Sequence, residues 1–133
     1  MTTNPISRFF RRISDSSGSV ATPRNWSVLA PPGEIDLATQ GYLDLLVDTE
    51  WSPDSHLVID LTGVRFIDST GLHWLFSARE KAVRADREMR LIVREGSPPD
   101  RLLTIAGVRE VFPIYRSLEE AVNNDWANGT SNE

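Results

Sequence analysis

The clearest signal for the fold is Leu57-Val58-Ile59-Asp60-Leu61, followed by Val64-Arg65-Phe66-Ile67 and then by Asp68-Ser69-Thr70-Gly71. The first two runs are short and apolar, which is typical of a buried strand and a second apolar segment behind it. The last four residues stand where an amphipathic helix begins, so Ser69 or Thr70 is expected at or near the helix N-cap. A helix start favours negative charge, and the sequence therefore predicts that a phosphate would be accommodated there.

The helix after this turn is expected to run to about Ala85. On a helical wheel, Leu72, Leu75, Phe76 and Val83 form one core-facing stripe, whereas Trp74 falls nearly opposite and His73 lies on the flank. Two interpretations of Trp74 remain open at this point. It is either an aromatic anchor for a partner protein, or it packs under a neighbouring loop or the N-terminal extension.

Strands and helices alternate along the rest of the chain. A strand over Trp26–Ala30 is stopped by Pro31-Pro32, because proline cannot donate to a ladder. Asp36 is expected to cap a helix from Leu37 to about Val47. The remaining expected elements are a strand at Met89–Val93, a helix ending near Ala106, an edge strand at Val111–Tyr115 and a helix that Ser117 and Glu120 open as a capping box. The pattern predicts a single α/β domain, with a mixed sheet and helices packed mainly on one face.

The two ends of the chain are less regular than residues 25–126, which we expect to form the domain. Residues 1–24 are either a loose extension or contain an edge strand at Arg8–Ile13 that feeds a hairpin toward Trp26–Ala30. Both alternatives stay open, because neither pattern is long enough to decide between them. Residues 127–133 are expected to be a frayed tail.

The composition of the chain excludes several classes of function. The 133 residues suffice for one domain with a core, and a formal charge of −5 with an acidic main body argues against broad nucleic-acid binding. No apolar run is long enough for a membrane span, and the first 24 residues lack the apolar stretch of a secretory signal. We therefore expect a cytoplasmic protein that does not insert into membranes.

Catalytic chemistry finds little support in the sequence. The turn at Ser69 is not the Gly-x-Ser-x-Gly elbow of a hydrolase, and no phosphate-binding glycine loop is present. His56 and His73 are the two histidines, and the chain has no cysteine, so no familiar metal-ligand spacing occurs. His73 stands four residues after Ser69 but is expected to be an ordinary exposed helix residue. The chain is therefore predicted to be no enzyme and to use no cofactor or metal.

Three motifs resemble those of STAS-domain anti-sigma-factor antagonists. Gly33-Glu34-Ile35-Asp36 is similar to the turn that opens the first helix in that family, and Asp68-Ser69-Thr70-Gly71-Leu72 is similar to its phosphoacceptor turn. Arg101-Leu102-Leu103 with Ile105-Ala106-Gly107-Val108 resembles a later helix and turn. The resemblance covers roughly residues 26–122. The chain departs from the family at Pro31-Pro32 and at His73, where antagonists commonly carry a small residue.

The resemblance implies a function by partner switching. The unphosphorylated chain would bind an anti-sigma factor that is also a serine kinase, and would so release the sigma factor. Phosphorylation of Ser69 would reverse this binding, and a serine phosphatase would restore it; ATP would belong to the kinase. The residues expected to bind the partner lie around Ser69: Asp36, Asp68, Thr70, Gly71, His73 and Trp74. The alternative is a scaffold of the same fold that does not switch, such as a subunit of a lipid-transport ABC complex or of a stressosome-like assembly.

Overall fold

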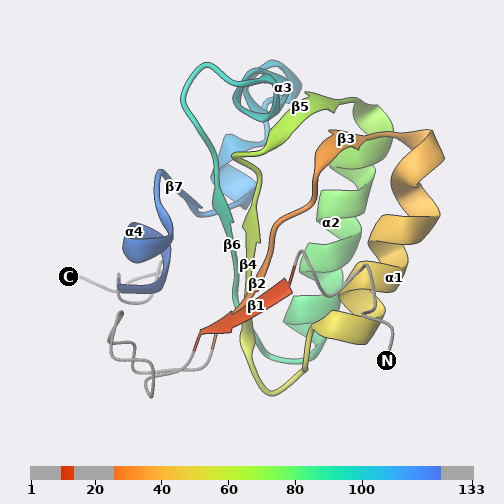
Figure 1. The fold of residues 1–133 in the computed structure, drawn as a ribbon. Coiled ribbons are helices and arrows are strands. Elements are labelled where there is room, and N and C mark those ends of the chain that lie inside the picture. Colours follow the sequence, from red (N-terminus) through yellow and green to blue (C-terminus); the bar gives the residue numbers. More distant parts are fainter. Residues whose placement is uncertain (1–9, 14–25, 124–133) are drawn as a thin grey trace.

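A five-stranded mixed sheet forms the centre of the domain (Figure 1). The computed structural model describes residues 10–13 and 26–123. The strand order is β1-β2-β4-β6-β7, in which β1 is antiparallel to β2 and the other neighbours are parallel. The bounds are Phe10–Ile13 for β1, Trp26–Leu29 for β2, His56–Asp60 for β4, Met89–Ile92 for β6 and Ile114–Tyr115 for β7. The predicted mixed α/β architecture is confirmed.

A second, two-stranded parallel sheet continues the chain beyond β2 and β4. It pairs β3 (Gly33–Ile35) with β5 (Val64–Ile67), and Ile35 stands opposite Ile67. Pro31 and Pro32 separate β3 from β2, as expected of residues that cannot donate to a ladder. The first three residues of the Gly33-Glu34-Ile35-Asp36 motif, which was expected as a turn, thus form a short strand.

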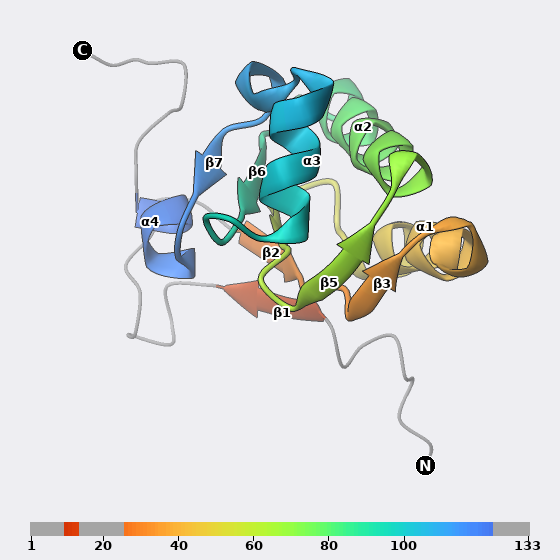
Figure 2. The same ribbon diagram turned by 90° about the horizontal axis from the view of Figure 1, so that it is seen from above.

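Helices cover mainly one face of the central sheet. That face carries η3 (Leu37–Thr39), α1 (Gln40–Glu50) and α2 (Ser69–Arg84), and α3 (Pro98–Ala106) packs beside β5 (Figures 1 and 2). A 3-10 turn, η4 (Arg109–Val111), leads into β7, and α4 (Leu118–Asn123) lies on the opposite face. No helix among the described residues is long and apolar enough to cross a membrane.

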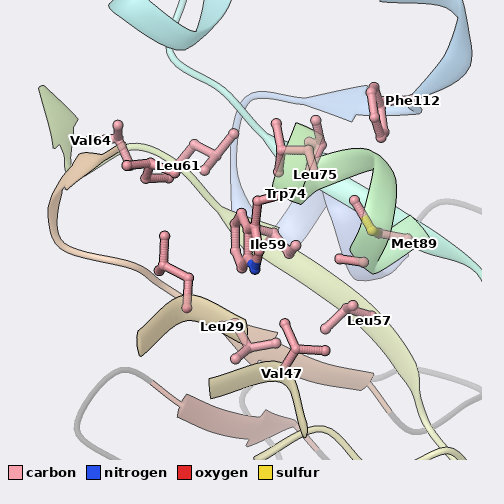
Figure 3. Packing of buried hydrophobic residues seen from close by; sticks show 14 of the residues in the cluster. Leu29, Val47, Leu57, Ile59, Leu61, Val64, Trp74, Leu75, Met89 and Phe112 are labelled. Carbon is pink, nitrogen blue, oxygen red and sulfur yellow. The ribbon is translucent and has the colours of Figure 1, made fainter. Parts of the chain in front are cut away.

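The alternation of β4 divides the core into two clusters. Leu57 and Ile59 point into the larger cluster under α1 and α2, whereas Val58 points into the smaller one under α4 (Figure 3 shows the larger). Leu43, Leu46 and Val47 of α1 join the larger cluster, as their helical spacing predicts.

Trp74 is part of this larger cluster, so the interpretation as an aromatic anchor for a partner is wrong, and the ring packs in the core instead of under a neighbouring loop. Its side chain is 2% exposed and lies among the core residues in Figure 3. The buried face of α2 consists of Gly71, Trp74, Leu75, Ala78 and Ala82, while Val83 is 55% exposed. The helical wheel failed because it gave weight to large apolar residues, and glycine and alanine mark the true face.

The smaller cluster is closed by a buried cation. Arg90 of β6 is 1% exposed; its Nη1 donates to the carbonyl of Ala121 at 2.6 Å and its Nε donates to Glu88 at 2.9 Å. The guanidinium also lies 4.6 Å from the centre of the Trp26 ring. Arg90 thus connects β6 to α4 through the hydrogen bond to Ala121, and to β2 through the cation–π contact with Trp26.

Several expectations for the ends of the chain meet the structure only in part. Phe10–Ile13 form β1 opposite β2, which is the pairing that one of the two alternatives required. The boundary near residue 24 and the tail at 127–133 lie outside the described residues. The strand expected at Val111–Tyr115 is reduced to Ile114–Tyr115, because η4 occupies the residues before Pro113.

The start of α2 approaches β3 so closely that only glycine fits at position 71. A Cβ on Gly71 would stand 2.6 Å from Ile67 Cγ1, 2.8 Å from Ile35 Cγ2 and 2.9 Å from the Ile35 carbonyl oxygen. Gly41 of α1 has open space around the same position.

We expect Gly71→Ala to lower the free energy of unfolding by about 1–3 kcal/mol, because the added methyl group overpacks the contact between α2 and β3. The matched change Gly41→Ala should raise it by about 0.5–1 kcal/mol, since alanine restricts the unfolded chain and favours the helix. Urea unfolding followed by tryptophan fluorescence measures both variants. Equal effects of the two substitutions would contradict the close approach at Gly71.

The turn before α3 is stabilised by the carboxylate of Asp100. Gly96 N donates to Asp100 Oδ2 at 2.8 Å, and Arg109 forms an ion pair with the other oxygen. The backbone hydrogen bond from Gly96 is the main reason why the pKa of Asp100 lies below its usual value; partial burial opposes this shift, and Arg109 and Arg101 add to it. Because the pKa is lowered in the folded state, the stabilisation is present above about pH 4 and is lost as the pH falls further.

Asp100→Asn should therefore lower the free energy of unfolding by about 1 kcal/mol at pH 7, and the difference from the wild type should shrink below pH 4. Denaturant unfolding at pH 7, 5 and 3 tests this dependence. Asp86→Asn is the control, because this exposed residue has a φ of 61° that asparagine also tolerates. A difference for Asp100→Asn that is the same at all three pH values would refute the electrostatic origin.

Candidate functional site

Two helices begin side by side at one end of the domain. The pairing of β3 with β5 sets Ile35 opposite Ile67, and Asp68 N donates to the Ile35 carbonyl at 3.4 Å. The residues that follow these strands, Asp36 and Asp68, therefore start η3 and α2 next to each other (Figure 2). The sequence expectation that the Asp36 loop lies beside the Ser69 turn agrees with this arrangement.

Asp68, and neither Ser69 nor Thr70, is the N-cap of α2. Its Oδ1 accepts hydrogen bonds from Thr70 N at 3.0 Å and from Gly71 N at 3.2 Å, and Ser69 is the first helical residue. The expectation of a helix start near Ser69 is right, but the capping group lies one residue earlier. Two of the amides that could hold a phosphate on Ser69, those of Thr70 and Gly71, therefore already bind a carboxylate.

Asp36 caps the neighbouring helix start, as predicted. Its Oδ1 accepts from Thr39 N at 3.2 Å, and its own backbone N–H donates to Thr39 Oγ1 at 3.0 Å. This reciprocal pair is a capping box and stabilises the turn between β3 and α1. The side chains of Asp36 and Asp68 are both half-buried, and hydrogen bonds to nearby backbone amides hold them in place.

The hydroxyl of Ser69 is accessible at this end of the domain. Ser69 and His73 are exposed, Thr70 is half-buried, and Gly71 is buried under the helix start. The structure therefore brings Asp36, Asp68, Ser69 and Thr70 together, while Gly71 acts as a spacer beneath them. Trp74 lies in the core and offers no surface to a partner.

Two exposed apolar residues border the turn and were not singled out from the sequence. Leu37, directly after Asp36, is 74% exposed, and Phe66, two residues before Asp68, is 48% exposed. On β5, Val64 and Ile67 are buried while Arg65 and Phe66 are exposed, so the strand breaks simple alternation. The apolar run Val64–Ile67 therefore does not by itself show that Phe66 is exposed.

A third exposed apolar side chain lies on the helix next to β5. Ile105 of α3 is 82% exposed, and α3 and β5 pack beside each other at the same end of the domain (Figure 2). Single exposed apolar residues are common on protein surfaces, so Ile105 by itself marks no contact surface.

The Ser69 turn is an open surface and not a cavity. A cavity of about 640 Å³ lies between the C-terminal half of α2 and η4, and none of its lining residues belongs to the turn. Among the described residues, no group of three or more His, Cys, Asp or Glu side chains could hold a metal ion. The arrangement offers a hydroxyl, two capped carboxylates and apolar side chains to a partner.

Comparisons with known proteins agree with this geometry. The family model of the STAS domain matches residues 19–121. The anti-sigma-F factor antagonist RsfB of Mycobacterium tuberculosis is 30% identical over 105 residues, which are 78% of this chain and 84% of that protein.

Solved structures give the same assignment. An anti-sigma factor antagonist from Mycobacterium paratuberculosis matches with a TM-score of 0.59 and 27% identity, covering 92% of this chain and 100% of that one. A sulfate transporter family protein from Wolinella succinogenes, 16% identical, shares the fold with a TM-score of 0.65 over 81% of this chain and 90% of that one. With the family model covering most of the sequence, and with the order of motifs and strands described above, this chain belongs to the STAS domain family.

Proposed function

We propose that this chain is an anti-sigma factor antagonist that works by partner switching. Unphosphorylated, it binds an anti-sigma factor that has serine-kinase activity; phosphorylation of Ser69 ends the binding, and a serine phosphatase restores it. The chain is then a substrate and binding partner in the cytoplasm, not an enzyme. Its similarity to two anti-sigma factor antagonists supports the general role.

The observation that carries the proposal is the exposed Ser69 hydroxyl at the first residue of α2. A kinase needs an accessible hydroxyl, and a partner that covers the turn needs apolar contact area around it. Leu37, the first residue of η3, and Phe66 of β5 supply such area close in sequence to Asp36 and Asp68. The same residue is thus open to modification and positioned within a docking surface.

The size of the required effect indicates where phosphorylation acts. A thousandfold change in affinity corresponds to about 4 kcal/mol. A phosphate adds about −1.5 to −2 charges beside Asp68, and the helix start offsets only about 0.3–1 kcal/mol of the repulsion. In the free chain, solvent screens most of this charge. Under a bound partner the phosphate loses its hydration, so the switch acts at the interface.

Tagged full-length chain, recovered from its native cells, should carry a single phosphate that a phosphatase removes. Intact-mass analysis should find this phosphate in Thr70→Ala and not in Ser69→Ala. A phosphate that persists in Ser69→Ala would reject Ser69 as the site.

Binding should respond to charge at the same position. Ser69→Asp should weaken retention of the copurifying serine kinase by tenfold or more, roughly 1.4 kcal/mol. Ser117→Asp is the matched control, because Ser117 caps α4 and aspartate caps equally well. A chain that stays unmodified under growth and stress, and whose partner tolerates Ser69→Asp, would be a scaffold that does not switch.

Stability separates an effect on the interface from an effect on the fold. Ser69→Ala and Ser69→Glu should each change the free energy of unfolding by less than about 0.5 kcal/mol, because the side chain is exposed. Asp68→Ala should lower it by about 1–2 kcal/mol through loss of the N-cap of α2. Thermal and urea unfolding of the three variants test this. A strong destabilisation by Ser69→Glu would mean that charge at position 69 acts by unfolding the domain and not by weakening the contact with a partner.

A further inference from the structure

His73 stands one helical turn after Ser69, and both residues are exposed. The buried face of α2 includes Gly71, Trp74 and Leu75, so the two exposed residues lie away from the core. Residues four apart on a helix have Cβ atoms about 5–6 Å from each other. Among the described residues, none forms a hydrogen bond or ion pair with the His73 side chain. The imidazole is therefore available to a group attached to Ser69.

Two of the amides at the helix start are already taken. Asp68 Oδ1 accepts from Thr70 N and Gly71 N, at 3.0 and 3.2 Å. The Asp68 carboxylate also repels a phosphate dianion on the next residue. A basic side chain one turn along α2 therefore offers the phosphate a contact away from this carboxylate.

The charged groups on the neighbouring elements are mostly acidic. Glu34 of β3 and Asp36 at the start of η3 are acidic, and so is Asp44 of α1, one turn before the Asp48 that pairs with Lys81 at 2.7 Å. Arg65 of β5 extends over the start of β3, since its Nη2 is 3.5 Å from where a Cβ on Gly33 would stand.

We infer that His73 holds the phosphate of phosphorylated Ser69, an inference that rests on the phosphorylation proposed above. A ring N–H of the imidazole donates a hydrogen bond to a phosphate oxygen one turn away, a contact strengthened by the charge of the phosphate. His73 thereby orients the phosphate along α2.

The test uses full-length chain with phosphoserine installed at position 69 by genetic code expansion, so no kinase is needed. Phosphorus NMR follows the titration of the phosphate in the unmodified background and in three variants. His73→Gln should raise the titration midpoint by about 0.3 pH units, the equivalent of an exposed pair four residues apart. His73→Arg should keep the midpoint low, because the guanidinium also donates hydrogen bonds to the phosphate.

Arg79→Gln is the matched control, because it also removes a basic side chain from the exposed surface of α2, but one that lies about 15 Å from Ser69 along the helix. It should leave the midpoint unchanged. A midpoint that His73→Gln does not move, or that Arg79→Gln moves equally, would overturn the assignment. Circular dichroism confirms that each variant is folded. If native kinases never modify Ser69, the proposed function fails while this measurement still reports on the contact.

Discussion

The contact of Gly71 with Ile35 is the constraint on which the rest of the site depends. It lets α2 start directly against β3, so that Asp36 and Asp68 cap two helices that begin side by side. Any larger residue at position 71 would move α2 away from a strand of only three residues, and the two turns would separate. The position of Ser69 is thus set by packing beneath it, while its own side chain is left free for chemistry.

Much of this arrangement was predictable because it follows from local patterns. Apolar runs located the strands, and a serine or aspartate before each amphipathic segment located the helix starts. The identity of the cap at α2 was not predictable, since aspartate, serine and threonine are all good caps and stand in succession. The hydrogen bond from Asp68 N to the Ile35 carbonyl favours Asp68 as the cap, because it holds the residue after β5 in the extended conformation that an N-cap adopts. That bond joins residues far apart in the sequence.

Trp74 shows a different limit of sequence reasoning. Its environment depends on which face of α2 meets the sheet, and small residues mark that face. Gly71, Ala78 and Ala82 allow the helix to come close, so the large ring is enclosed by its neighbours and Val83 is left at the surface. A helical wheel that weights residues by their apolar size misses a buried face made mainly of glycine and alanine. The short β7 has a simpler cause, since η4 occupies the residues before Pro113 and Pro113 itself has no N–H to donate to the ladder.

The fold alone does not determine a switch, because a sulfate transporter family protein has the same architecture at 16% identity. The features of this chain on which the proposed function rests are therefore the residues at the turn: an exposed hydroxyl, two aspartates that cap helices and exposed apolar side chains. The hydrogen bonds of the two capping carboxylates do not involve the Ser69 hydroxyl. Under the function proposed above, a phosphate on this hydroxyl would change the charge at the turn while these capping hydrogen bonds stay in place.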